Sequence, residues 1–190
     1  MTDIPHTAPL GAPRLASMLT RADAVAKRLA APVLGLAGRL VFAATLAGFF
    51  WSSALTKIDG FGLSLNAYAQ VFPRAMEAVG YDASQLGALA HLIVAAGTAA
   101  EFVLPLLLIL GLFTRLAALG SIGFLLVMSL TDVIGHGVDA SAIGALFDRA
   151  PDAPILDQRL LWGFLMLVLV FTGGGALSLD RWLRRRFPLG

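Results

Sequence analysis

Four long apolar stretches limit what this 190-residue chain can fold into. They cover about residues 33–55, 86–112, 116–134 and 160–177. A helix that crosses the hydrocarbon core of a bilayer needs about 20 predominantly apolar residues, and each stretch approaches or exceeds that length. We therefore expect an all-α polytopic membrane protein, a four-transmembrane-helix bundle with short amphipathic interfacial helices.

The composition excludes several other classes of protein. Hydrophobic residues make up 58% of the chain and charged residues 14%, whereas a soluble domain carries about 25% charged residues. A disordered chain and a nucleic-acid-binding domain are excluded, so we expect no nucleic acid partner. The chain has no cysteine, which excludes disulfides, thiolate zinc sites and cysteine-ligated iron–sulfur clusters.

The basic residues sort to one side of the membrane when the amino terminus is placed in the cytoplasm. The inner segments then carry Arg14, Arg21, Lys27, Arg28, Arg115, Arg181, Arg184, Arg185 and Arg186, and the outer segments carry Lys57, Arg74, Arg149 and Arg159. Basic residues near span ends favour the cytoplasmic side. We therefore expect a multi-pass protein of the inner membrane with both termini cytoplasmic.

The segments between the spans show helical patterns of their own. Residues 1–32 are expected to form a cytoplasmic amphipathic basic segment on the anionic inner surface, 33–183 the membrane domain, and 184–190 a basic cytoplasmic tail. Apolar residues at helical spacing predict a helix over 68–79, with Pro73 at the start of its regular part. A helix over 140–147 would place Ile143, Leu146 and Phe147 on one face. The glycines at 173–175 are expected to end the fourth span.

Glu101 and Arg39 lie well inside the predicted spans, where a charged side chain costs about 2.5–3.5 kcal/mol on insertion scales. Their depths differ by roughly 7–8 Å at about 1.5 Å per residue, which an extended arginine can bridge. A pair would neutralise both charges and join the two helices. Two interpretations stay open: an ion pair that locks the bundle, or a polar pocket for a hydrogen-bonding ligand or a proton, with both residues as candidate catalytic groups.

A second polar layer is expected near the outer face. Lys57 closes the first span, His91 lies about one turn inside the second, and Asp132 and His136 share a helical face at the end of the third. These candidate ligand-binding residues could hold a metal ion, a quinone head group or a partner's anion, or be interfacial residues whose charged ends reach water. We assign no metal site. Haem between His91 and His136 is not expected.

Three segments in the right order resemble the DoxX family: residues 53–57 (SALTK), 99–115 (AAEFVLPLLLILGLFTR) and 173–180 (GGGALSLD). The similarity covers about residues 35–183, although Gly174 stands where a proline is common. It implies a four-helix inner-membrane protein. By position, the polar residues Arg39, Lys57, Glu101, Arg115 and Asp180 match those of the family, the last two as structural residues.

The resemblance also implies a loose functional theme, because some DoxX relatives are subunits of quinone-linked oxidoreductases. We therefore expect a membrane subunit or accessory of a quinone-linked redox system, with Arg39 donating to a quinone carbonyl and Glu101 carrying protons. No cofactor is expected to be covalently bound. Because the chain offers no bound redox centre, electrons would come from a protein partner subunit. The alternative is a non-enzymatic membrane anchor that docks a partner in a metal- or oxidative-stress system. The sequence leaves open whether the chain catalyses a reaction.

Overall fold

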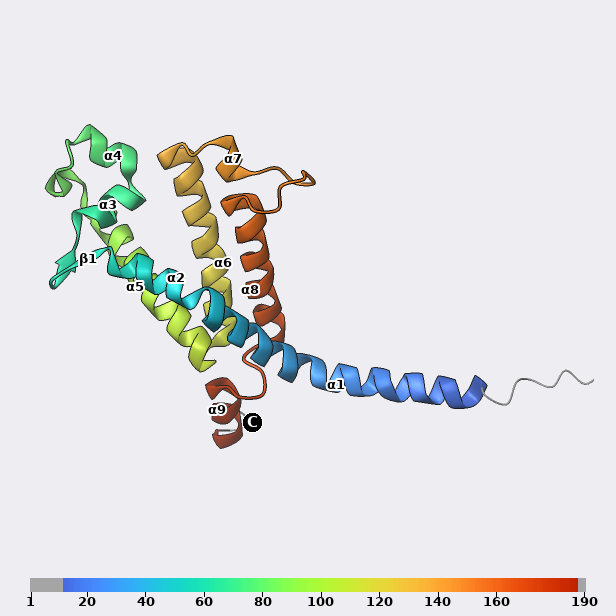
Figure 1. Cartoon of the computed structure of the whole chain (residues 1–190). Helices are drawn as coiled ribbons and strands as arrows, with labels where there is room; N and C mark the ends of the chain where they lie inside the picture. Colours follow the sequence, from blue (N-terminus) through green and yellow to red (C-terminus); the bar gives the residue numbers. More distant parts are fainter. Residues whose placement is uncertain (1–11, 188–190) are drawn as a thin grey trace, which may run out of the picture.

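The computed structural model describes residues 12–187, with side chains from residue 16 onward (Figure 1). Residues 1–11 of the predicted amino-terminal segment, the side chain of Arg14 and residues 188–190 of the predicted tail lie outside this part. Within it, four helices are long and apolar enough to cross a membrane: Ala16–Thr45, Ala88–Leu110, Thr114–His136 and Pro154–Thr172. The predicted all-α, four-span architecture is confirmed.

The first span continues the amino-terminal helix without a break. Helix α1 (Ala12–Thr45) runs through Pro32 and is followed by α2 (Ala47–Leu55). Residues 16–31 are exposed and project away from the bundle (Figure 1). The predicted amino-terminal segment and the predicted first span therefore belong to one continuous helix. The Ala-, Leu- and Arg-rich sequence before Pro32 has high helix propensity, and the helix extends through it into the span.

The bundle itself is built from α1, α2, α5 (Ala88–Leu110), α6 (Thr114–Leu130) and α8 (Leu160–Thr172). Helix α6 packs against α8 and α5, α1 packs against α8 and α5, and α2 packs against α5. The core contains Phe42, Leu46, Ala47, Phe50, Leu108, Ala117, Ala118, Leu125, Met166 and Leu169. The π-helical turns η2 (Thr131–His136) and η3 (Pro154–Arg159) extend α6 and α8 at the same end of the bundle.

Glycines allow α1 to touch the turn that follows α8. A Cβ atom on Gly35 would lie 2.4 Å from the carbonyl oxygen of Gly173, and one on Gly175 would lie 2.2 Å from the amide nitrogen of Leu36. Gly175 also has a φ of +76°, which a residue with a side chain rarely adopts. Helix α8 ends at Thr172, directly before the glycines, as predicted, so the fourth span stops short of residue 177.

Short elements cover the end of the bundle opposite the α5–α6 turn (Figure 1). They are the hairpin β1 (Ile58–Asp59) and β2 (Gly62–Leu63), α3 (Leu65–Val71), α4 (Pro73–Ala78) and the 3₁₀ turn η1 (Ala83–Gln85). Pro73 is the first residue of α4, as predicted. Ala67, Tyr68 and Met76 form a small core with Val94 of α5, which fixes this cap to the bundle.

The predicted helix over 140–147 is shorter in the structure. Helix α7 covers only Ala140–Ile143, because Gly144 takes a φ of +77° that ends it. Phe147 also has a positive φ and is fully exposed. The expected common face of Ile143, Leu146 and Phe147 is therefore wrong. At the other end of the chain, α9 (Leu179–Arg186) is a short helix carrying four of the basic residues.

Candidate functional site

Arg39 binds backbone carbonyl groups rather than Glu101. Its Nε donates to the carbonyl of Leu108 at 2.7 Å, and Nη1 donates to those of Gly174 at 2.8 Å and Leu177 at 2.6 Å. Its Nη2 donates to Ile109. The last carbonyls of a helix have no partner within that helix. Arg39 therefore caps the end of α5 and connects it to the glycine turn, residues 173–177, that follows α8.

Asp180 completes this connection from the other side. Its carboxylate accepts hydrogen bonds from the backbone amides of Phe113 at 2.7 Å and Thr114 at 2.9 Å, and from the Thr114 hydroxyl at 2.7 Å. These donors form the start of α6, where a negative charge is favourable. Arg115 donates from Nη2 to the carbonyl of Phe171. Asp180 and Arg115, which we expect to be structural residues, thus bind groups of neighbouring helices, and Arg39 lies in the same cluster.

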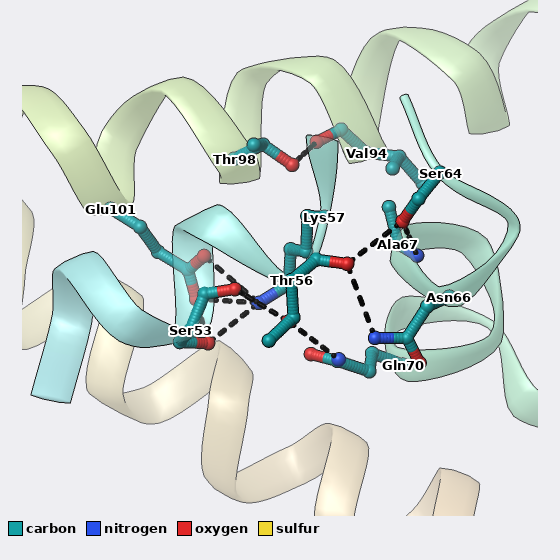
Figure 2. Close-up of polar contacts among 10 residues, drawn as sticks. All are labelled: Ser53, Thr56, Lys57, Ser64, Asn66, Ala67, Gln70, Val94, Thr98 and Glu101. Carbon is teal, nitrogen blue, oxygen red and sulfur yellow. Dashed lines mark hydrogen bonds and ion pairs between the residues drawn. The ribbon is translucent and has the colours of Figure 1, made fainter. Parts of the chain in front are cut away.

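Glu101 pairs with Lys57. The Lys57 ammonium lies 2.9 Å from each carboxylate oxygen of Glu101 and donates to the Ser53 hydroxyl at 2.7 Å, and that hydroxyl donates to Glu101 at 3.0 Å (Figure 2). Lys57 and Glu101 are 5% and 4% exposed. The Arg39–Glu101 pair that the sequence allowed is therefore not formed. Arg39 is occupied by the end of α5, and the end of α2 brings Lys57 inward to Glu101.

The position of Lys57 is fixed by hydrogen bonds around the end of α2. The carbonyl of Thr56 accepts from the Ser64 hydroxyl at 2.9 Å and the Asn66 side-chain amide at 3.3 Å, and its hydroxyl accepts from Gln70 at 3.2 Å (Figure 2). The amide of Ser64 also donates to the carbonyl of Lys57 at 2.9 Å. The chain thus folds back over α2, so Lys57 points into the bundle rather than toward the membrane surface.

A cavity of about 690 Å³ lies between α5 and α6 against this ion pair. Its polar lining comprises Ser53, Lys57, Gln70, Glu101, Thr131, Asp132, His136 and Arg159, and the rest is apolar or small, including Ala96, Gly97, Ala100, Leu104, Gly123 and Phe124. Ile93 of α5 and Val127 of α6 line its edge and are 40% and 58% exposed. The cavity therefore reaches the surface of two predicted spans, where lipid would lie.

The predicted outer polar layer is only partly assembled. Lys57, Asp132 and His136 line the cavity. Asp132 pairs with Arg159, which also donates to the Ser129 hydroxyl at 3.1 Å, and His136 Nε2 lies 3.0 Å from the carbonyl of Gln70. His91 is not among the cavity-lining residues that the structure describes, and its Nδ1 lies 2.8 Å from the Tyr68 hydroxyl in the cap.

Sequence reasoning missed Arg159, Ser53 and Gln70 at the cavity. The charge pattern places Arg159 in an outer segment, yet it directly precedes α8 and its side chain reaches η2. Ser53 stands four residues before Lys57, a spacing that places two side chains on the same face of a helix, so the pattern Ser53-x-x-x-Lys57 carried a usable signal. Gln70 belongs to the cap, whose position no local pattern gives.

The described residues contain no group of three or more His, Cys, Asp or Glu side chains arranged to hold a metal ion. Polar groups at the cavity are instead arranged as two ion pairs, Lys57–Glu101 and Arg159–Asp132, with Ser53 and His136 beside them. Their chemistry is that of hydrogen-bond donors and proton carriers. An apolar cavity with a few charged groups at one end suits a ligand that has a polar head and an apolar tail.

Comparison with known families identifies the chain. A family model described as DoxX matches residues 34–136, more than half of the sequence. The chain belongs to the DoxX family. No curated protein and no solved structure matches it. The DoxX match includes Arg39, Lys57 and Glu101, so the ion pair and most of the cavity lie within the family domain, whereas Arg159, Asp180 and α9 follow it.

Proposed function

We propose that this DoxX protein is the quinone-binding membrane subunit of a redox system, and that the cavity between α5 and α6 is its quinone site. The observation that supports this most is the continuity between a buried ion pair and a lipid-facing apolar edge within one cavity. A quinone dissolves in the bilayer through its tail and has two carbonyl oxygens that accept hydrogen bonds. The volume of about 690 Å³ is within the range of small-molecule sites.

The residues present suit such a head group. The Lys57 ammonium donates hydrogen bonds and has Ser53 and Glu101 as exchangeable partners, so a ligand carbonyl can replace one of them. Ser53 connects Lys57 to Glu101 and can pass a proton between them. When bound, a quinone accepts two electrons and two protons to become a quinol. We assign Glu101 as the group that carries the proton. Its neighbour in the cavity is Lys57 rather than Arg39.

The electrons are proposed to come from a partner redox subunit. The chain has no cysteine and therefore cannot hold a thiolate-ligated iron–sulfur cluster.

The DoxX protein itself is proposed to lie in the inner membrane with both termini cytoplasmic, because its basic residues gather on one side of the spans. Because the natural chain has no cysteine, Ala24→Cys and Ala145→Cys, both at exposed sites, would each carry a single thiol. A membrane-impermeant maleimide added to intact cells should label the second variant but not the first.

Quinone binding can be tested without altering the ion pair. A Cβ on Gly97, which lines the cavity, meets nothing within 4 Å, so the leucine side chain of Gly97→Leu should occupy part of the cavity and obstruct a ligand there. Gly163 of α8 is equally open but outside the cavity, so Gly163→Leu is the matched control. We expect a short-chain benzoquinone or naphthoquinone to quench tryptophan fluorescence saturably in detergent. Gly97→Leu should weaken binding by about tenfold or more, a loss of at least 1.4 kcal/mol.

Two results would reject this function. One is wild-type protein that binds neither quinone saturably, and the other is equal affinity in Gly97→Leu and the control. Extraction of the lipids that co-purify with the protein gives an independent readout. A stoichiometric protein partner together with no extracted quinone would favour the alternative, a membrane anchor in which Lys57–Glu101 is solely structural.

A further inference from the structure

A second groove lies at the opposite end of the bundle, between the end of α5 and α9. It has a volume of about 590 Å³. Its apolar walls include Ile109, Leu110 and Leu179. Its lining also includes Arg181, Trp182 and Arg185 of α9. Leu110 and Trp182 are 42% and 58% exposed. The groove therefore combines an accessible apolar wall with two guanidinium groups.

No ion pair among the described residues neutralises the arginines of this groove. The ion pairs in the described part of the chain are Lys27–Asp23, Lys57–Glu101 and Arg159–Asp132, and none involves α9. The nearest carboxylate in sequence, that of Asp180, is held by the start of α6. Arg181 and Arg185 are four residues apart on α9, a spacing at which like charges repel. An anion between them would remove that repulsion.

Helix stability does not explain Arg181. Basic residues are favourable in the last turn of a helix and unfavourable in the first. Arg184, Arg185 and Arg186 lie in the last turn of α9, whereas Arg181 lies in its first turn. Arg184 also donates to the carbonyl of Asp180 within the helix. Arg181 and Arg185 are the two arginines that line the groove, so the placement of Arg181 suits a ligand rather than the helix.

The depth of the groove indicates the kind of anion. Ile109 and Leu110 are the last residues of a predicted span, so the groove lies where the hydrocarbon core gives way to the head-group layer. Tryptophan is enriched at this depth, and basic residues beside span ends attract anionic lipids. A free inorganic anion would leave the apolar wall uncovered. A phospholipid covers it with an acyl chain while its phosphate meets the arginines.

We propose that this groove binds an anionic phospholipid, with its phosphate between Arg181 and Arg185 and an acyl chain along Ile109 and Leu110. Trp182 closes the side of the groove at the membrane interface. The site anchors α9 to the bilayer and so holds the segment that carries Asp180, whose backbone amide donates to the carbonyl of Gly111 at 2.9 Å. This site is separate from the quinone cavity and does not depend on that proposal.

Native mass spectrometry of the full-length protein in detergent tests the proposal. The probes are dioleoyl phosphatidylglycerol, dioleoyl phosphatidylcholine and inorganic phosphate. We expect phosphatidylglycerol to bind more tightly than phosphatidylcholine, and Arg181→Gln/Arg185→Gln to weaken its binding. Each basic residue near an anionic surface contributes roughly 5-fold in affinity, so the double variant should lose about 25-fold. Arg184→Gln/Arg186→Gln, which removes the same charge outside the groove, is the matched control and should lose much less.

The proposal is overturned if the two double variants lose the same affinity, because binding would then reflect net charge alone. It is also overturned if phosphatidylcholine binds as tightly as phosphatidylglycerol. Displacement of the lipid by inorganic phosphate at equal concentration would instead identify a free-anion site. Should the double variant fail to fold, Arg185→Gln changes one exposed side chain and should still lose about 5-fold, against a much smaller loss for Arg186→Gln.

Discussion

The Lys57–Glu101 pair makes the sharpest prediction about stability. Both side chains are nearly inaccessible, at 5% and 4% exposure, and the ammonium contacts both carboxylate oxygens at 2.9 Å. Removing one partner of a buried pair costs about 3–5 kcal/mol, because the other charge is left without compensation. At about 2–4 °C per kcal/mol for a chain of this size, Lys57→Met or Glu101→Gln should lower Tm by roughly 6–20 °C.

A double-mutant cycle in detergent measures the coupling directly. The variants are Lys57→Met, Glu101→Gln and the combination of both, followed by thermal unfolding monitored through tryptophan fluorescence. We expect the double variant to be more stable than the sum of the single losses predicts, by about 1–3 kcal/mol. Arg39→Gln combined with Glu101→Gln is the control, and its effects should add. Additive losses for Lys57 and Glu101, or coupling between Arg39 and Glu101, would refute the assignment of the pair.

Three further outcomes follow from the fold. Gly175→Ala should abolish folded protein, because its Cβ would lie 2.2 Å from the Leu36 amide nitrogen. Gly163→Ala, whose Cβ meets nothing within 4 Å, should leave the yield of folded protein unchanged. Size-exclusion chromatography measures the yield of both variants, and equal yields would contradict the prediction. Asp180→Asn should destabilise by about 1–3 kcal/mol, since its carboxylate accepts three hydrogen bonds at the start of α6; an unchanged Tm would contradict this. The hydroxyl of Ser84, the side-chain amide of Gln85 and the backbone amide of Ser84 lower the pKa of Asp82. Because its folded pKa is the lower one, Asp82 stabilises the fold above its unfolded pKa and loses that effect as the pH falls through the folded value. The difference in Tm between wild type and Asp82→Ala should therefore be present at pH 7 and shrink below about pH 4; a difference that grows on acidification would reverse the sign.

The sequence predicted the four spans because lipid imposes a length and an apolar composition that are visible residue by residue. It also placed the start of α4 at Pro73 and the end of α8 before the glycines at 173–175, since both signals are local. The expected amino-terminal segment and the first span form one helix, α1, because helix propensity is high on both sides of Pro32. The helix over 140–147 failed at Gly144, whose backbone conformation ends it.

The polar pairing could not be read from depth alone. Arg39 and Glu101 are close enough in depth to pair, but the structure gives Arg39 four carbonyl partners at the ends of α5 and the glycine turn. Those carbonyls come within reach of Arg39 only when α1, the end of α5 and the segment after α8 meet in the folded protein. Likewise, Lys57 reaches Glu101 because the side chains of Ser64 and Asn66 donate to the carbonyl of Thr56 and fix the end of α2. Side chains that depend on tertiary contacts need the fold before their partners can be assigned.

Photolabelling with an azidoquinone tests the central proposal most directly. The purified protein is irradiated with the probe, digested and mapped by mass spectrometry, with and without an excess of unmodified quinone. The account predicts labels on cavity-lining residues of α5 and α6, such as Gly97, Phe124 or Met128, which the excess quinone suppresses. Labels spread over the exposed surface of α8, or labels that excess quinone does not reduce, would contradict a quinone site in this cavity.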